Sequence, residues 1–404
     1  MRLLYEISIH LFNAAVALAA LFGNSKARLM IRGRRGVVAR ALAENEDDAR
    51  TTVWVHCASL GEFEQGRPLI EKIKEQSPDV KIVLTFFSPS GYEVRKNFPK
   101  ADYIYYLPSD TARNARRFVK AIKPDVAIFV KYEYWYNYLR ELRGAEAKSY
   151  VVSAIFREGI YFFKPYGGFF RGMLRLIDWF FVQNQESQRL LSSIGIVDNV
   201  TITGDTRFDR VADIVAKAPQ LPIVERFAAG SKVVVCGSTW MADFHLLLPL
   251  MQNHPDIKFI IAPHQIDESE IEKMIKMSGR EATRYTQRSN PEATLMIIDC
   301  IGILSGVYAY GDIAYIGGGF GVGIHNILEA ATWGKPVIFG PNYRKFREAV
   351  DLVTLGGAFS VADFSQLNQT FAHILDNQVQ ISQISKAYVE QNIGATKHIL
   401  EKIL

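Results

Sequence analysis

The stretch YIGGGFGVGIHNILEAATWGKPVIFG, residues 315–340, has the pattern of a strand, a glycine-rich loop, a helix and a second strand. Five of residues 317–323 are glycine, and we expect a helix to open near His325 and Asn326, with Glu329 on the same face of its first turn. Such a loop offers backbone N–H groups and a helix N-terminus to a phosphate, and the acid could accept two ribose hydroxyls. The alternative is a tight strand–helix turn in which Glu329 is only a first-turn acid. The pattern is not GxxxxGK[ST], which excludes a P-loop NTPase.

The same alternation of strands and helices continues on both sides of residues 315–340. The segment KAPQLP, residues 217–222, interrupts it and is typical of a linker. We therefore predict two Rossmann-like parallel-sheet domains, residues 25–216 and 223–404, whose ligands bind at the carboxyl ends of the strands. The predicted strands are Val53–Cys57, Lys81–Phe87, Tyr103–Leu107, Asp125–Val130, Tyr150–Ala154, Trp179–Val182, Val200–Thr203, Lys232–Cys236, Ile257–Ala262, Thr294–Ile298, Ile313–Gly317 and Val337–Gly340.

Composition narrows the class of protein. Of 404 residues, 49% are hydrophobic and 22% charged, which is ordinary for a globular protein. The three cysteines are too far apart for a disulfide framework or a CxxC motif, and we expect no bound metal. Residues 1–210 carry 31 basic and 23 acidic residues, whereas the remainder carries 16 and 19. The first half should therefore face an anionic partner. Nucleic acid is not expected, because the basic residues are dispersed and form no recognition motif.

The N-terminus suggests where that anionic surface lies. Leu3–Phe22 is mostly apolar, is interrupted by Glu6, His10 and Asn13, and is followed by six basic residues between positions 26 and 40. A cleaved signal peptide is not expected, because the positive charge follows the apolar run. The segment could be a marginal transmembrane helix, an interfacial helix or a buried first helix. We predict that residues 1–24 are a membrane-associated helix, with the rest of the chain on the cytoplasmic face.

Three loops in the first half could carry chemistry. Ser59–Glu62 fits a capping box, but Glu62 could instead be a general base at the mouth of a cleft. Ser88 and Ser90 flank a proline after a predicted strand, which is typical of a helix start or of an anion site. Glu133 lies among aromatic residues in VKYEYWYN, where core packing is the usual explanation.

Taken together, these blocks resemble a known family. WVHCASLGEFEQGRPLI, TFFSPSGYE, YLPSD, KPDVAIFVKYEYWYN, FFVQNQES, TGDTRFD, GSTW and GGGFGVGIHNILEAATWGKPVIFGP occur in the order seen in 3-deoxy-D-manno-octulosonic acid (Kdo) transferases. The resemblance implies the GT-B architecture, in which two Rossmann-like domains face each other across a cleft. It also implies inverting transfer of Kdo from CMP-Kdo to a lipid A precursor at the cytoplasmic face of the bacterial inner membrane, with no cofactor.

The resemblance also implies roles for individual residues. Glu62 would be the general base, and Glu133 is the reserve candidate or a neighbour that orients the site. The residues expected around the donor are Gly237, Ser238, Thr239, His264, Gly318, Gly319, Gly321, Gly323, His325, Asn326 and Glu329. Those expected around the acceptor are Ser59, Gly61, Ser88, Ser90, Gly91 and Arg157.

The chain departs from the family pattern at several positions. The usual arginine before His264 is missing, and we expect Arg207 to help grip the donor phosphate. Ile155 replaces an early arginine of the next motif, where Arg157 would serve instead. Lys131 and Tyr136 stand where the family commonly has an acid and a proline.

Two other functions fit parts of the pattern. One is another GT-B enzyme that uses a UDP-sugar, either a transferase or an epimerase. The other is a non-catalytic membrane adaptor that binds a nucleotide. The presence of both Glu62 and Glu329 argues against an adaptor, because binding alone does not need a carboxylate in each domain.

Overall fold

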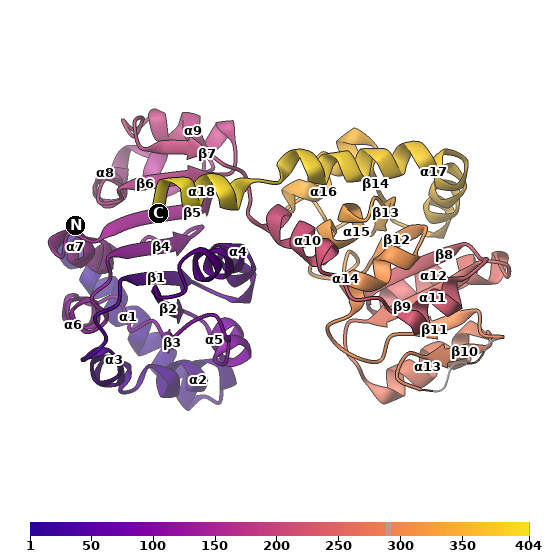
Figure 1. Ribbon diagram of the computed structural model, residues 1–404, viewed down its shortest axis with the longest axis horizontal. Coiled ribbons are helices and arrows are strands. Elements are labelled where there is room, and N and C mark those ends of the chain that lie inside the picture. Colours follow the sequence, from indigo (N-terminus) through magenta and orange to yellow (C-terminus); the bar gives the residue numbers. More distant parts are fainter. Residues whose placement is uncertain (288–289, 291, 404) are drawn as a thin grey trace. The chain divides into compact units, whose positions relative to one another are not determined.

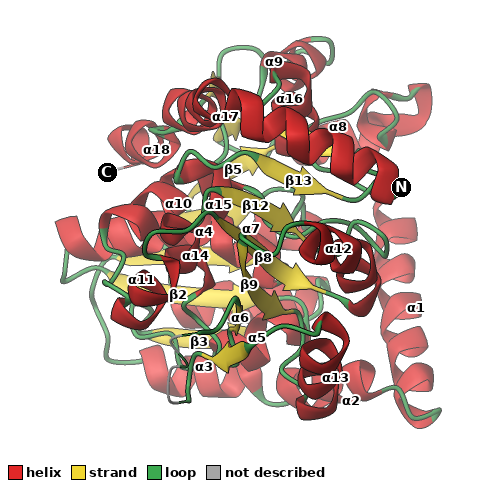
Figure 2. Cartoon of the chain, turned by 90° about the vertical axis from the view of Figure 1, so that its right-hand side faces the viewer, coloured by secondary structure: helices red, strands yellow, loops and turns green. Residues whose placement is uncertain are grey.

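The computed structural model describes residues 1–287, 290 and 292–403 and divides into two compact units. Unit 1 comprises Met1–Arg210 and Gly394–Leu404, and unit 2 comprises Val211–Ile393. In both units the strands lie among layers of helices (Figures 1 and 2). This confirms the predicted α/β class with two parallel sheets.

Unit 1 contains a seven-stranded sheet in which every paired strand is parallel. Its strands are β1 (Thr52–Cys57), β2 (Lys81–Phe86), β3 (Tyr103–Tyr106), β4 (Val126–Val130), β5 (Lys148–Ala154), β6 (Trp179–Val182) and β7 (Val200–Ile202). Their order is β3-β2-β1-β4-β5-β6-β7, so the chain reverses its direction of travel across the sheet between β1 and β4. That reversal is where open α/β sheets bind ligands.

The second sheet, in unit 2, has the same type of strand order. Its strands are β8 (Val233–Thr239), β9 (Lys258–Pro263), β10 (Ala282–Arg284), β11 (Leu295–Ile297), β12 (Ile313–Ile316), β13 (Val337–Phe339) and β14 (Ala358–Ser360). The order is β10-β11-β9-β8-β12-β13-β14, and the reversal falls between β8 and β12. The predicted strands are confirmed within a few residues. The edge strands β10 and β14 were not predicted, because neither forms the apolar or β-branched run that marks the equally short β7, β11 and β13.

Helices cover both sheets. Unit 1 has α1 (Arg2–Leu21), α2 (Ser25–Arg34), α3 (Val37–Asn45), α4 (Leu60–Gln76), α5 (Pro89–Arg95), α6 (Ala112–Ile122), α7 (Tyr136–Gly144), α8 (Gly168–Leu174), α9 (Gln185–Ser192) and α18 (Ala395–Ile403), and α10 (Arg207–Ala216) continues into unit 2. Unit 2 has α11 (Pro222–Ala228), α12 (Met241–Asn253), α13 (Glu268–Ser278), α14 (Leu304–Val307), α15 (Leu328–Thr332), α16 (Arg347–Leu355) and α17 (Phe364–Asn392).

The central strands are buried on both faces, which explains their nearly continuous apolar sequences. All six residues of β1 and all six of β2 are buried. Alternate side chains enter two different cores: Trp54 and Val83 pack on one face of the sheet, and Val55 and Leu84 on the other. Parallel sheets covered by helices on both sides have this composition.

The last helix differs from the predicted domain boundaries. Residues 223–404 were expected to form one domain, yet α18 packs on α4 of unit 1. The Asp209 carboxylate accepts hydrogen bonds from the backbone N–H groups of Gly394 and Thr396, both at 2.6 Å, and so holds the start of α18. The Lys402 ammonium lies 3.9 Å from the centre of the Trp179 ring. The final residues thus complete the first unit.

Helix α1 has one face on unit 1 and one exposed apolar face. Tyr5 donates a hydrogen bond to Asp110, and Asn13, two turns further on, accepts one of 2.7 Å from Ser109. The opposite face carries exposed apolar side chains: Leu3, Leu4, Ile7, Leu11, Leu18 and Leu21. Among the described residues, α1 is the one helix long and apolar enough to cross a membrane, and 6% of its most apolar window is buried. The alternative of a buried first helix is therefore wrong.

Candidate active site

The predicted catalytic acids lie at the reversal point of the first sheet. Glu62 follows β1 in the first turn of α4, and Glu133 follows β4. Because β1 and β4 are parallel neighbours, their carboxyl ends deliver both loops to the same edge.

Glu62 does not form the capping box that its spacing allows. Ser59 is the residue before α4, but its side chain makes no hydrogen bond to the backbone of that helix. Instead its hydroxyl donates to the Glu62 carboxylate. The carboxylate is partly exposed and is held beside Ser59 at the sheet edge. This arrangement removes the main structural explanation for an acid at this position.

Glu133 lies between two ring nitrogens. Its Oε2 lies 2.8 Å from Trp135 Nε1, which donates to it, and 3.1 Å from His56 Nε2. The loop turns sharply just before it, because Lys131 adopts a φ of +68°, a conformation that is unfavourable for a lysine. Such strain is tolerated where the surroundings fix the backbone. The loop therefore presents Glu133 in one orientation.

Electrostatic interactions place the two acids in one neighbourhood. Burial raises the pKa of Cys57, and the charges of Glu62 and Glu133 raise it further. Burial likewise raises the pKa of Tyr132, while Arg157 opposes and Glu62 reinforces the shift. Glu62, Glu133 and Arg157 therefore lie near the same end of the sheet.

The serine loop after β2 joins the same edge. Ser88 N donates to the carbonyl of Ala58 at 2.8 Å, and the Ser88 and Ser90 hydroxyls are 2.8 Å apart. Gly91 has a packing role instead, because a Cβ at this position would lie 2.3 Å from the Phe86 ring. Gly61 is exposed, and an added Cβ would meet only Ser59 Oγ at 3.7 Å.

Arg207, the residue expected to grip the donor phosphate, belongs to unit 1. Its guanidinium lies 2.8 Å from the carboxylate of Asp205, which also accepts hydrogen bonds from Gln65. Burial opposes ionisation of Asp205, yet Arg207 and these hydrogen bonds hold its pKa below the usual value. Arg207 thus pairs with Asp205, and Asp205 links this segment to Gln65 of α4.

The predicted donor residues gather at the reversal point of the second sheet. Ser238 and Thr239 are the last residues of β8, which leads into a loop at Trp240, and the loop after β12 carries the glycines. One residue that was not predicted, Asp243 of α12, fastens the two loops together. Its buried carboxylate accepts from Trp240 N and Gly318 N, both at 3.0 Å, and from Tyr315 Oη at 2.9 Å. A single acid near the start of a helix gave no sequence signal for this role.

Several glycines in these loops are required by the protein itself. An added Cβ would lie 2.2 Å from the Ser238 carbonyl at Gly317, and 2.6 Å from the Gly340 backbone at Gly319. At Gly237 it would overlap the Tyr308 hydroxyl at 1.8 Å. Thr239 is also structural, since its hydroxyl donates to the Cys236 carbonyl at 3.0 Å. Gly321, by contrast, is exposed.

The helix after the glycine loop begins later than predicted. It opens at Leu328 and has five residues, so His325 and Asn326 lie in the loop. The expectation that Glu329 shares a helix face with them is therefore wrong. Asn326 nevertheless reaches Glu329 Oε1 through its side-chain amide at 3.1 Å. Glu329 also lies near Tyr308, whose pKa is raised by burial and then by that carboxylate.

Three rings form an aromatic cluster beside this loop. Trp240 stacks on His264 with ring centres 4.1 Å apart, and His264 lies 4.5 Å from His325. Burial lowers the pKa of His325, and the neighbouring His264 lowers it further. The cluster brings together residues from three loops, which come after β8, β9 and β12. The three rings give this edge of the sheet an aromatic surface.

A basic residue that was not predicted lies at the same loop. Lys345 Nζ donates to the carbonyl of Val322, and a Cβ on Gly323 would meet the Lys345 side chain at 2.6 Å. Lys345 therefore places a cation against the glycine loop within unit 2. The sequence did not predict this contact, because Lys345 lies far from the loop along the chain.

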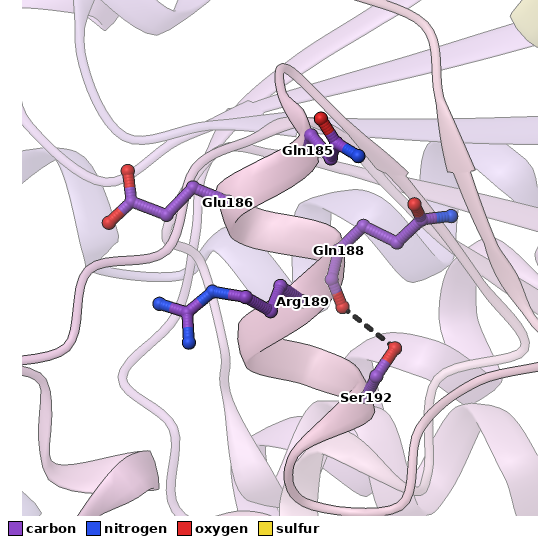
Figure 3. Close-up of a pocket in the computed structure, with 5 residues that line it drawn as sticks. All are labelled: Gln185, Glu186, Gln188, Arg189 and Ser192. Atoms are coloured by element: carbon purple, nitrogen blue, oxygen red, sulfur yellow. Dashed lines mark hydrogen bonds between the residues drawn. The ribbon is translucent and has the colours of Figure 1, made fainter.

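A separate surface hollow contains none of the predicted site residues. It is lined by Gln185, Glu186, Gln188, Arg189 and Ser192 of α9 (Figure 3). Arg189 pairs with Glu158 at 2.8 Å, and Ser192 donates to the Gln188 carbonyl. The hollow is one face of a surface helix and belongs to neither reversal point.

Comparisons with known proteins agree with this geometry. The family model described as 3-Deoxy-D-manno-octulosonic-acid transferase (kdotransferase) matches residues 30–210. The 3-deoxy-D-manno-octulosonic acid transferase of Aquifex aeolicus is 26% identical over 360 residues, which cover 85% of this chain and 92% of that protein. The chain is therefore similar to Kdo transferases over most of its length.

Two other relatives are similar over about three quarters of this chain. The 3-deoxy-D-manno-octulosonic acid transferase of Rickettsia felis is 28% identical over 74% of this chain and 65% of its own length. A bifunctional glycosyltransferase/methyltransferase of Fusobacterium nucleatum is 28% identical over 71% of this chain. The match spans about half of that bifunctional protein, 47%.

The solved structures that resemble this chain support its fold and not its function. The UDP-GlcNAc 2-epimerase of Neisseria meningitidis has a TM-score of 0.62 at 18% identity and covers 87% of this chain and 99% of that one. MurG of Acinetobacter baumannii has a TM-score of 0.57 at 14% identity over 87% and 99%. These likenesses confirm the GT-B fold.

The contacts of Asp243 generate a stability prediction. Asp243→Ala leaves three donors without their acceptor, and each buried unsatisfied group costs about 1–3 kcal/mol. We expect the free energy of unfolding to fall by about 3 kcal/mol or more in a urea titration. Tyr315→Phe removes one of the donors and should cost about 1 kcal/mol. An equal decrease in the free energy of unfolding in the two variants would contradict the role of Asp243 as the residue that links both loops.

Proposed function

We propose that the protein is an inverting glycosyltransferase that moves Kdo from CMP-Kdo to a lipid A precursor. The observation that carries the proposal is the position of Glu62. Its carboxylate lies partly exposed at the reversal point of the first sheet, bonded to Ser59 and near Glu133. Similarity to Kdo transferases supports the reaction class.

The chemistry requires a base in unit 1. A sugar hydroxyl of the acceptor attacks the anomeric carbon of Kdo and gives its proton to Glu62. A new carbon–oxygen bond forms, while the bond from that carbon to the phosphate oxygen breaks and CMP leaves with the electron pair. Attack from the face opposite CMP inverts the configuration. A positioned carboxylate contributes about 10²–10⁴-fold to such a step.

The donor would bind to unit 2 through loops rather than through a helix dipole. Helix α15 has only five residues, so its macrodipole is small. The glycine loop and Lys345 are the more suitable partners for the CMP phosphate, and Lys345 replaces Arg207 in our assignment. Glu329, oriented by Asn326, would accept the ribose hydroxyls. The rings of Trp240, His264 and His325 offer a stacking surface nearby.

Arg34 of unit 1 is a suitable cation for the phosphate of the acceptor. Arg34 lies in a hollow between α1 and α2 that is also lined by Asn13, Val16, Met30, Ile31, Arg35 and Ser109. The guanidinium makes long hydrogen bonds, 3.3 Å to the Phe87 carbonyl and 3.4 Å to Ser109. Burial lowers the pKa of Arg34 to about 10. It forms no ion pair with an acid among the described residues, so an anionic ligand would compensate its charge.

The exposed face of α1 suggests how the protein would meet its lipid. The inner face of this helix is hydrogen-bonded to unit 1, whereas its outer face is apolar. That division is typical of a helix lying in the membrane surface. We propose that α1 holds the protein on the cytoplasmic face of the bacterial inner membrane, where basic residues of α2 would meet anionic lipid.

Product analysis with a variant tests the reaction. Wild-type protein incubated with CMP-Kdo and a lipid A precursor should give a product heavier by one or more Kdo units in mass spectrometry. Glu62→Gln keeps the shape of the side chain and the contact with Ser59 but removes its basicity, and should lower turnover at least a hundredfold. Near-normal turnover in this variant would exclude Glu62 as the base. Product formation with a UDP-sugar instead would support the alternative GT-B activity.

The ribose contact gives a separate prediction. Glu329→Ala should weaken CMP binding about ten- to a hundredfold, because a hydrogen bond to a charged group contributes about 1.5–3 kcal/mol. Calorimetric titration with CMP measures the change. Glu390→Ala removes the same charge from α17 and should leave the affinity unchanged. Unaltered affinity in a folded Glu329→Ala protein would contradict the donor site, and tighter binding of UDP than CMP would contradict the donor.

Membrane attachment can be tested without removing α1, which would expose its binding surface on unit 1. Leu4, Leu11 and Leu18 repeat every seven residues along the helix and are 59%, 65% and 54% exposed. Changing all three to Gln should move the protein from the membrane fraction to the supernatant at high salt, which screens the basic residues. The matched control changes the exposed Val94, Val197 and Val379 to Gln. A triple leucine variant that stays membrane-bound would place the anchor elsewhere.

A further inference from the structure

We propose that His56 is a positioning residue: Thr85 fixes its tautomer, and the ring then donates a hydrogen bond that orients Glu133 for the transfer. The proposal rests on the proposed function, because Glu133 is assigned there as a neighbour of the base. His56 lies in the middle of the WVHCASLGEF motif, yet no role was expected for it. Its side chain is completely buried.

The ring lies in a continuous chain of hydrogen bonds that joins two strands and a loop. His56 of β1 is in register with Thr85 of β2, and its Nδ1 lies 2.8 Å from Thr85 Oγ1. Trp54 Nε1 donates to the same Thr85 oxygen at 2.8 Å. On the other side of the ring, Nε2 lies 3.1 Å from Glu133 Oε2. Every member of the chain except Glu133 is fully buried.

The donors and acceptors in this chain select one tautomer. Trp54 can only donate, so Thr85 Oγ1 accepts from it and keeps its own hydrogen. That hydrogen has a suitable acceptor in His56 Nδ1, at 2.8 Å. A neutral ring whose Nδ1 accepts carries its proton on Nε2, from which it donates to Glu133. In the opposite tautomer, the hydroxyl hydrogen of Thr85 would have no acceptor in this chain. The unprotonated Nε2 of His56 would then face the Glu133 carboxylate, although both groups are acceptors.

The result is a carboxylate with one oxygen fully occupied. Glu133 Oε2 accepts from His56 on one side and from Trp135 on the other. No hydrogen bond from a described residue reaches Oε1, and the side chain retains 13% of its exposure. Oε1 is therefore available to accept a hydrogen bond from a substrate hydroxyl. Losing the His56 donor would let the Glu133 side chain rotate about its remaining bond to Trp135.

Two substitutions at position 56 test the contact of Nε2 with Glu133 separately from the contact of Nδ1 with Thr85. Gln places an amide N–H near the position of Nε2, so His56→Gln should keep the bond to Glu133 and retain turnover within a few fold. Asn reaches only the Nδ1 position, so His56→Asn keeps the bond to Thr85 and loses the donor to Glu133. We expect kcat for Kdo transfer to fall about ten- to a hundredfold in His56→Asn, with little change in the KM for CMP-Kdo. His245→Gln, on the exposed part of α12, is the control.

A double-mutant cycle distinguishes positioning from general structural damage. If His56 acts through Glu133, His56→Asn should cost less than threefold in a Glu133→Gln background, because the oriented carboxylate is already absent. Equal costs in both backgrounds would overturn the proposal. So would equal losses of turnover in His56→Asn and His56→Gln.

The tautomer itself can be measured without any activity. In protein labelled with ¹⁵N-histidine, long-range ¹H–¹⁵N spectra should show His56 as the Nε2–H tautomer. Thr85→Val removes the fixing hydroxyl and should change that pattern, whereas Thr85→Ser should preserve it. An Nδ1–H ring in the wild-type protein would overturn the proposal even if Kdo transfer is confirmed. An Nε2–H ring in a protein that does not transfer Kdo would instead locate the failure in the proposed function.

Discussion

Parallel strands deliver the loops at their carboxyl ends to one edge, and this constraint determines where chemistry can occur in both units. The order of strands reverses between β1 and β4 and again between β8 and β12. At each reversal the two following loops diverge to opposite faces of the sheet and leave room for a ligand. Glu62 and Glu133 occupy one such position, and the glycine loop occupies the other.

Buried polar groups fix the geometry at both edges. Asp243 joins two loops in unit 2, and the Trp54–Thr85–His56 chain supports Glu133 in unit 1. Each network is buried in an otherwise apolar sheet, where an unmatched donor is costly. That cost favours a single arrangement of the loops, since alternatives would leave buried groups unsatisfied. Rigid support of this kind suits a site that must hold a weakly acidic hydroxyl in one orientation.

The sequence was sufficient for the architecture and for the location of the candidate site. Continuous apolar runs identified the long central strands, because strands buried on both faces contain little else. The edge strand β10 was missed because Ala-Thr-Arg forms no apolar run, and the true start of α15 was missed because a five-residue helix is too short to show a period. His56 and Asp243 were missed for another reason: their partners are distant in sequence. Arg207 was assigned to the donor from residue type alone, whereas the structure pairs it with Asp205.

Helix α1 is connected to the loop of Glu133 through one carboxylate. Tyr5 donates to Asp110, and the Asp110 carboxylate also accepts from the backbone N–H groups of Asn137 and Tyr138, at 3.2 and 3.1 Å. These N–H groups belong to the first turn of α7, which begins three residues after Glu133. A helix start held by a buried acid is fixed in position, and the residues just before it are fixed with it. The same acid therefore secures the helix that we propose lies on the lipid and the loop that we propose orients the reaction, which links membrane attachment to the geometry of the site.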